Sequence, residues 1–116
     1  MFLRHLALLP LLVGLAVPAF AAEVRPLTEW KFKKLGKDAS PETETVTIPH
    51  TWNASDATAN KFYRGPAVYT RDLGPGGVFA GKRVFLRCEA VSIMTEIVLN
   101  GKRVGEHRGA FSEFGF

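Results

Sequence analysis

The sequence has few of the residues that disulfide-linked and metal-dependent folds require. A single cysteine, Cys88, occurs among 116 residues, so no disulfide can form within the chain. Cys88 lies in an alternating apolar stretch, which favours a buried thiol over a nucleophile. Three scattered histidines do not make a zinc site with it, and residues 74–77 lack the lysine of a phosphate-binding glycine loop. We therefore predict neither a metal nor a cofactor.

The excess of positive over negative charge is also small. The formal net charge is +4, and the basic residues are spread along the chain without a block of Lys and Arg. This pattern gives little support for nucleic acid as a partner. Glu42, Glu44 and Glu113 have no apolar surroundings in the sequence that would indicate a catalytic pair. We expect these carboxylates to be solvated.

The one long hydrophobic run lies at the N-terminus. Arg4 precedes an almost wholly apolar stretch, Leu6–Val17, and Ala19-Phe20-Ala21 then has the small-x-small pattern of a cleavage site. Residues 1–21 are therefore predicted to be a secretory signal peptide. The run is shorter than the roughly 20 residues that a spanning helix needs, although a retained N-terminal anchor is the alternative. We expect a mature chain, residues 22–116, that is secreted or periplasmic and has no membrane partner after cleavage.

Short strands dominate the expected mature chain. Asn100-Gly101 lies between two alternating runs, and it predicts a type I′ hairpin because both residues tolerate positive φ. The polar residues 53–61 are expected to form an exposed loop. We expect an all-β, antiparallel sandwich without an amphipathic helix. The strands are predicted at residues 46–48, 67–73, 83–90, 95–99 and 102–106, where apolar residues are β-branched or alternate with polar ones.

The end of the chain carries a dense aromatic group, Phe111, Phe114 and Phe116, which needs a surface to pack on. A β-sandwich needs about seven or eight strands, whereas this pattern predicts five or six. We therefore expect the sandwich to be incomplete at its C-terminus.

Five ordered segments together resemble the N-terminal sugar-binding domain of glycoside hydrolase family 2, the β-galactosidase, β-glucuronidase and β-mannosidase group. The resemblance covers nearly all of residues 22–116, and Cys88 stands where the family usually has an aromatic residue. The segments are Trp30-Lys31-Phe32, Ile48-Pro49-His50-Thr51-Trp52-Asn53, Tyr63-Arg64-Gly65 with Val68-Tyr69-Thr70-Arg71, Lys82–Val91, and Val98–His107 continuing to Phe114.

The resemblance implies a jelly-roll, galactose-binding-like β-sandwich over residues 22–116. In the family, an immunoglobulin-like domain and a (β/α)8 barrel follow in the same chain. The barrel carries the two glutamates of a retaining glycosidase, whose carboxyl groups lie about 5–5.5 Å apart. Neither catalytic motif occurs here, so we predict no catalytic residue in this chain. The implied function is the carbohydrate-binding portion of an exported glycosidase, of the β-galactosidase type, that is inactive alone. A free-standing secreted carbohydrate-binding module and a truncated reading frame without a stable product are the alternatives.

Polar residues at two places are the expected carbohydrate contacts. Asn53 opens the polar loop, and its amide can donate to and accept from hydroxyl groups at once. The segment after the hairpin lies, in the family, toward the active-site side, although a solvated turn is the alternative reading. His50 is expected to pack and hydrogen-bond, and Trp52 to belong to the core. The predicted substrate contacts are Asn53, Asp56, Arg64, Glu106, His107 and Arg108.

Overall fold

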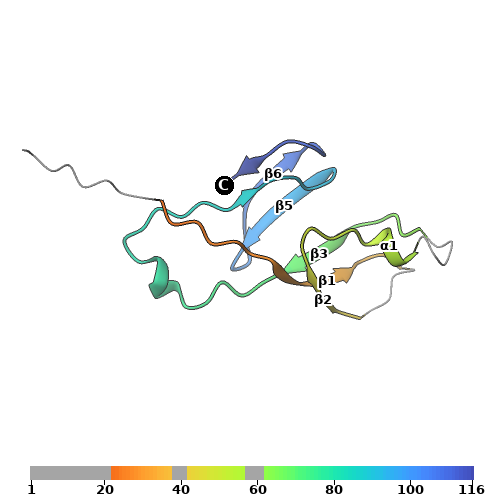
Figure 1. The fold of residues 1–116 in the computed structure, drawn as a ribbon, viewed down its shortest axis with the longest axis horizontal. Coiled ribbons are helices and arrows are strands. Elements are labelled where there is room, and N and C mark those ends of the chain that lie inside the picture. Colours follow the sequence, from red (N-terminus) through yellow and green to blue (C-terminus); the bar gives the residue numbers. More distant parts are fainter. Residues whose placement is uncertain (1–21, 38–41, 57–61) are drawn as a thin grey trace, which may run out of the picture. The chain divides into compact units, whose positions relative to one another are not determined.

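A computed structural model of the chain describes residues 22–37, 42–56 and 62–116. The predicted signal peptide, residues 1–21, lies outside the described residues. The chain divides into two compact units, Met1–Arg71 (unit 1) and Asp72–Phe116 (unit 2). Figure 1 shows the order of the elements in each unit.

Unit 1 contains a three-stranded antiparallel sheet in the order β2-β1-β3 (Figure 1). Its strands are β1 (Glu29–Lys34), β2 (Glu44–Thr47) and β3 (Ala67–Thr70). The central strand β1 places Trp30 opposite Val46 on one neighbour and Phe32 opposite Tyr69 on the other. A single helical turn, α1 (Asn53–Asp56), follows β2.

The centre of unit 1 is an aromatic cluster around Phe32. The Phe32 side chain is 2% exposed. Its ring meets His50 edge-on at 4.8 Å between centroids, lies tilted against Tyr69 at 4.9 Å, and stacks on Trp52 at 6.0 Å. The segment from His50 to Trp52 therefore folds back onto β1, because the His50 and Trp52 rings pack on Phe32 and remove apolar surface from water.

Unit 2 contains two pairs of antiparallel strands, β4-β7 and β5-β6. A short 3-10 helix, η1 (Gly76–Phe79), precedes them. The turn between β5 and β6 has φ of 49° at Asn100 and 77° at Gly101, so the predicted type I′ hairpin is confirmed. The strands are β4 (Arg87–Cys88), β5 (Met94–Leu99), β6 (Lys102–Arg108) and β7 (Phe114–Gly115).

The two strand pairs of unit 2 pack through β6 and β7. The His107 ring stacks on Phe114 with centroids 4.0 Å apart, and Phe114 meets Phe116 edge-on at 5.8 Å. The Phe116 ring lies against Gly105. Phe111 does not join this group, because its side chain is 97% exposed. The predicted aromatic cluster is thus correct for Phe114 and Phe116 and wrong for Phe111.

The predicted all-β, antiparallel fold is confirmed, and the sheets are consistent with a β-sandwich. The strand predicted over residues 83–90 is wrong in its length: in the described part of unit 2 no strand lies beside residues 82–85, and a strand forms only where a neighbour accepts and donates hydrogen bonds. Of the predicted stretch only residues 87–88 form a strand, β4, and Leu86 exchanges two further hydrogen bonds with Phe116. Seven strands are described, instead of the five or six expected.

Two further features concern helices. The predicted loop over residues 53–61 is wrong in its first part, because residues 53–56 form the turn α1, where the Ala54 amide donates to the Thr51 carbonyl oxygen. The remainder of that loop lies outside the described residues. Among the residues that the structure describes, no helix has the length and apolar character to cross a membrane.

Candidate functional site in two parts

Asn53, a predicted substrate contact, is engaged with the backbone of Tyr63. Its Nδ2 donates to the Tyr63 carbonyl oxygen at 3.2 Å, and its Oδ1 accepts from the Tyr63 N–H at 3.0 Å. The amide therefore pairs with the backbone of a residue ten positions later in the sequence, much as a neighbouring strand would. An asparagine amide has two N–H donors and two acceptor lone pairs, and these two hydrogen bonds use one of each.

The Tyr63 side chain anchors the same region to the end of β1. Its hydroxyl donates to the Pro66 carbonyl oxygen at 2.6 Å and accepts from the Gly36 N–H at 2.9 Å. The ring passes so close to two glycines that a Cβ on Gly36 would lie 3.0 Å, and one on Gly65 2.5 Å, from the hydroxyl oxygen. Lys34 places its ammonium 5.4 Å from the ring centroid. We call residues 62–66 the Tyr63 turn.

Arg64 and Asp56 lie in the same unit as Asn53. Arg64 is exposed at the centre of the Tyr63 turn, between Tyr63, which Asn53 holds, and Gly65. Asp56 is the last residue of α1, and its side chain lies outside the described part of the structure. Among the predicted contacts in unit 1, Arg64 is therefore the exposed residue that the structure describes. The structure also shows that Tyr63 holds the turn around Arg64, which the sequence did not predict. The glycines at 36 and 65 were the available signal, because a close approach to backbone requires glycine.

The second half of the predicted set, on β6, is divided between two faces of the strand. His107 points inward, where it stacks on Phe114 and lies 3.1 Å from the Ser112 Oγ through its Nε2. Glu106 and Arg108 are exposed on the other face. Adjacent residues of a strand point to opposite sides, so these three side chains cannot contact one ligand from the same face.

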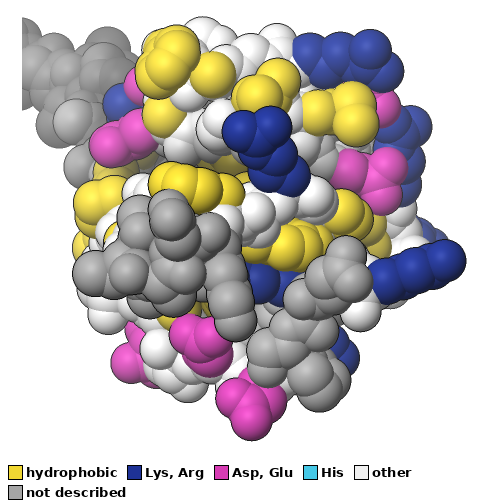
Figure 2. All heavy atoms as spheres, turned by 90° about the vertical axis from the view of Figure 1, so that its right-hand side faces the viewer, with side chains coloured by type: hydrophobic (Ala, Val, Ile, Leu, Met, Phe, Trp, Pro, Cys, Tyr) yellow, Lys and Arg dark blue, Asp and Glu magenta, His cyan; other side chains and the backbone are white. Residues whose placement is uncertain are grey.

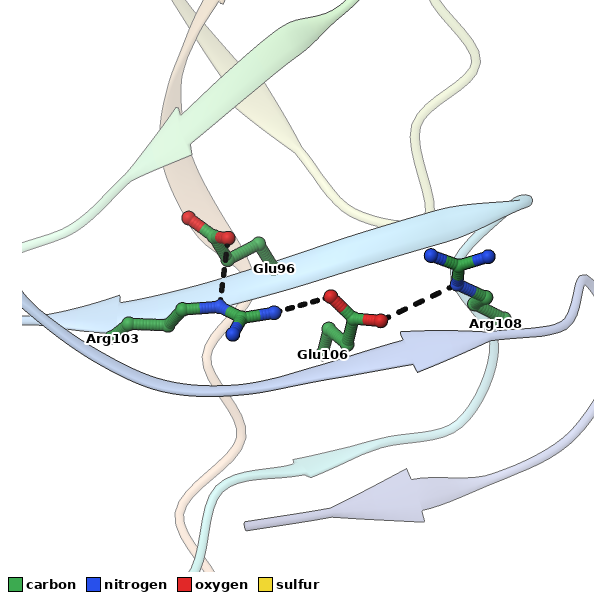
Figure 3. Close-up of polar contacts among 4 residues, drawn as sticks. All are labelled: Glu96, Arg103, Glu106 and Arg108. Carbon is green, nitrogen blue, oxygen red and sulfur yellow. Dashed lines mark hydrogen bonds and ion pairs between the residues drawn. The ribbon is translucent and has the colours of Figure 1, made fainter.

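The outer face of the β5-β6 hairpin carries a row of alternating charges (Figure 3). Arg103 pairs with Glu96 through its Nε at 2.9 Å and with Glu106 through a terminal nitrogen. Glu106 also accepts from the Arg108 Nε at 3.3 Å. Each of these side chains is at least two-fifths exposed, so the pairs stabilise the fold little. We call Glu96, Arg103, Glu106 and Arg108 the charge row.

The charge row arises from the β-bulge in the hairpin. Ile97 pairs with Gly105 and Val98 with Arg103, so Val104 is an additional residue in β6. A bulge shifts the alternation of one strand by one residue. It thereby brings Arg103 onto the same face as Glu106, which a regular strand would place on the opposite side. The sequence reasoning named Glu106 and Arg108 but missed Glu96 and Arg103.

The surroundings of His50 and Cys88 are those expected for structural residues. The His50 Nδ1 lies 2.8 Å from the Tyr69 hydroxyl, and its ring packs on Phe32, as expected for a structural histidine. Burial raises the pKa of the Tyr69 phenol. Burial also raises the pKa of the half-buried Cys88 thiol, which disfavours the nucleophilic thiolate.

Glu42, Glu44 and Glu113, the carboxylates expected to be solvated, are all exposed. Glu113 lies 2.6 Å from Arg87 on an exposed surface, which agrees with the expectation of a solvated carboxylate. Among residues 22–37, 42–56 and 62–116, no three His, Cys, Asp or Glu side chains gather as metal ligands would.

Comparison with known proteins identifies relatives of this chain. A β-glucuronidase from Bacteroides fragilis is 34% identical over 108 residues, which is 91% of this chain and 15% of the relative. A putative β-glucuronidase from Formosa agariphila is 37% identical over 73 residues, and a β-glucuronidase from the same organism is 26% identical over 105 residues. The chain is related to glycosidases.

The chain spans only a small part of these relatives, 15%, 9% and 11% of their lengths. No family model matches the sequence. No solved structure matches it either.

Proposed function

We propose that this chain is the carbohydrate-binding portion of an exported glycosidase of family 2 that acts on β-glucuronides. The observation that carries this proposal is the 34% sequence identity to a β-glucuronidase over 91% of the chain. The five ordered segments that resemble the sugar-binding domain of that family support it. A β-galactosidase, the activity expected from the resemblance alone, is the second candidate, since galactosidases share the same segments.

In this proposal the chain binds sugar and does not cleave it. The catalytic glutamates belong to a (β/α)8 barrel, which together with an immunoglobulin-like domain completes the parent protein as its partner. Residues 1–21 direct the protein to the periplasm or the outside of the cell and are then removed. Arg64 and Asp56 in unit 1 are proposed contacts to substrate hydroxyl or carboxylate groups. In unit 2, the proposed contacts are Glu106 and Arg108 on the exposed face of β6, with His107 as a separate candidate on its other face.

Sugar titrations test the ligand. We expect the chain to bind methyl β-glucuronide more tightly than methyl β-galactoside, because the Arg64 guanidinium can form charge-assisted hydrogen bonds with the uronate carboxylate. Arg64→Ala is expected to remove that preference, while Arg83→Ala, an exposed arginine outside the proposed contact set, is the matched control. A preference for the galactoside would favour the second candidate, and binding of neither sugar would contradict both.

Two further measurements test where catalysis is located and which architecture the parent protein has. The purified chain should not hydrolyse nitrophenyl glycosides, and turnover that persists after Glu106→Gln and Glu113→Gln would contradict the assignment of catalysis to the barrel. The coding sequence after Phe116 distinguishes the architectures. An in-frame continuation into immunoglobulin-like and barrel sequences supports the proposal, whereas a stop codon supports the free-standing module or a truncated product.

A further inference from the structure

Two sets of hydrogen bonds hold the Tyr63 turn. Both polar groups of the Asn53 amide bind the backbone of Tyr63. The Tyr63 hydroxyl in turn binds the Pro66 carbonyl oxygen and the Gly36 N–H. The Pro66 carbonyl oxygen also accepts from the Leu35 N–H at 2.9 Å. The Asn53 side chain thus fixes the start of the Tyr63 turn, and the backbone of Leu35 and Gly36, directly after β1, fixes its end.

These bonds fix the backbone on both sides of Arg64. Its predecessor, Tyr63, has both its N–H and its carbonyl group held by Asn53. After it, Gly65 lies against the Tyr63 ring, and the Pro66 carbonyl oxygen is bonded to the N–H of Leu35, the residue that follows β1. Arg64 itself is exposed. A charged side chain that projects from a turn held in this way loses less conformational entropy when it binds, because the backbone is already ordered.

We propose that Asn53 is a positioning residue that acts through the backbone of Tyr63 and presents Arg64, instead of contacting the sugar itself. The part that concerns sugar rests on the proposed function. The part that concerns the Tyr63 turn does not, since it follows from the contacts within unit 1.

Limited trypsin digestion of the complete chain tests the positioning role, because trypsin cleaves after Arg64 only when the surrounding backbone opens. Asn53→Ala removes both hydrogen bonds to Tyr63 and should accelerate cleavage after Arg64 about tenfold. Asn53→Asp keeps an acceptor for the Tyr63 N–H and loses the donor, so its rate should be intermediate. Thr51→Ala, an exposed neighbour in the same segment, is the matched control and should digest at the wild-type rate.

Cleavage after Lys31, within the central strand β1, reports general unfolding of unit 1. A positioning role predicts that the Lys31 rate stays within about twofold of wild type in Asn53→Ala. Equal acceleration at Lys31 and Arg64 would overturn the proposal, because Asn53 would then support the whole unit. An unchanged rate at Arg64 would overturn it as well.

Titration with methyl β-glucuronide tests the consequence for sugar. Asn53→Ala and Arg64→Ala should both weaken binding, and Asn53→Asp should restore part of the loss, in the same order as the trypsin rates. Loss of affinity in Asn53→Ala without a faster Arg64 cleavage would identify Asn53 as a direct contact and overturn the proposal. If the wild-type chain binds no sugar, the proposed function fails, and the digestion still decides the positioning role.

Discussion

Gly105 and Phe116 lie in contact in unit 2. A Cβ placed on Gly105 would lie 2.7 Å from the Phe116 Cδ1 and closer still to its Cε1. Real Cβ atoms do not approach aromatic carbons so closely, so the ring or the strand would have to move. Packing therefore favours glycine at this position, because a side chain here would displace the Phe116 ring or the strand β6.

Gly105→Ala should destabilise unit 2 by about 1–3 kcal/mol, the usual cost of inserting a methyl group into a packed contact. Urea unfolding followed by circular dichroism measures the change. Gly76→Ala is the matched control, because a Cβ there meets nothing within 4 Å. The control should be neutral or slightly stabilising, since alanine restricts the unfolded chain. Equal effects of the two substitutions would contradict the packing argument.

The Tyr69 phenol makes the stability of unit 1 sensitive to alkali. Burial raises its pKa in the folded state above the ordinary value of about 10. As the pH rises, the Tyr69 phenol therefore loses its proton first in the unfolded state. Its contribution to the free energy of unfolding is fully present below about pH 10 and is lost as the pH rises from the pKa of the unfolded state to that of the folded state. Tyr69→Phe should lower stability near neutral pH by about 1 kcal/mol, through the lost hydrogen bond to His50, and should flatten the decline. Urea midpoints between pH 8 and 11 test this, and an equally steep decline in Tyr69→Phe would exclude Tyr69 as the cause.

At the scale of elements, the β5-β6 hairpin depends on its turn. Asn100 and Gly101 both adopt positive φ, and a left-handed backbone costs most residues roughly 1–2 kcal/mol. Gly101→Ala should therefore destabilise the hairpin by about 1 kcal/mol, whereas Asn100→Gly should leave stability nearly unchanged because glycine adopts this conformation freely. Hydrogen exchange of the β5 and β6 amides measures both. Faster exchange in Asn100→Gly than in Gly101→Ala would contradict the prediction.

Elements with a local signal could be predicted from the sequence. The hairpin follows from Asn100-Gly101 between alternating runs, and β2 follows from β-branched residues before Pro49. The length of β4 could not be predicted, because it depends on which residues lie beside it and not on its own alternation. The turn α1 was missed for a related reason: it is a single turn of four residues, and periodicity identifies only longer helices.

In the candidate site, too, only features with a local signal could be predicted from the sequence. His50 and Trp52 were correctly expected to pack, because their place beside a strand end favours the core. The engagement of Asn53 with Tyr63 could not be predicted, since the two residues are ten positions apart and nothing local pairs them. The charge row depends on a bulge at Val104, and a one-residue shift in register is invisible in a charge pattern.

At the scale of the whole molecule, little of the described chain is buried. Among the described hydrophobic residues only Phe32 is buried, and many large apolar side chains are exposed. Figure 2 shows hydrophobic side chains at the surface, interspersed with Lys, Arg, Asp and Glu. Unit 2 has only two-stranded sheets, and such pairs are marginally stable in water without further layers to pack on. Unit 1 has a third strand and the Phe32 cluster, so we expect it to be the more stable unit.

Residues 22–116 should therefore unfold at low urea and in two steps, unit 2 before unit 1. The chain offers one probe for each unit. Trp30 and Trp52, its only tryptophans, lie in unit 1, so their fluorescence reports that unit. Cys88, its only cysteine, is half-buried in unit 2, so its rate of labelling by a thiol reagent reports the other.

We expect Cys88 to be labelled at the rate of the fully unfolded chain at a urea concentration where the tryptophan fluorescence is still that of the folded state. Gly105→Ala should lower the urea midpoint of labelling and leave the fluorescence midpoint unchanged, because the substituted contact lies wholly within unit 2. Coincident, sharp transitions of both probes at high urea would show instead that residues 22–116 form one cooperative domain. That outcome would contradict the expectation that this portion of the chain folds marginally by itself.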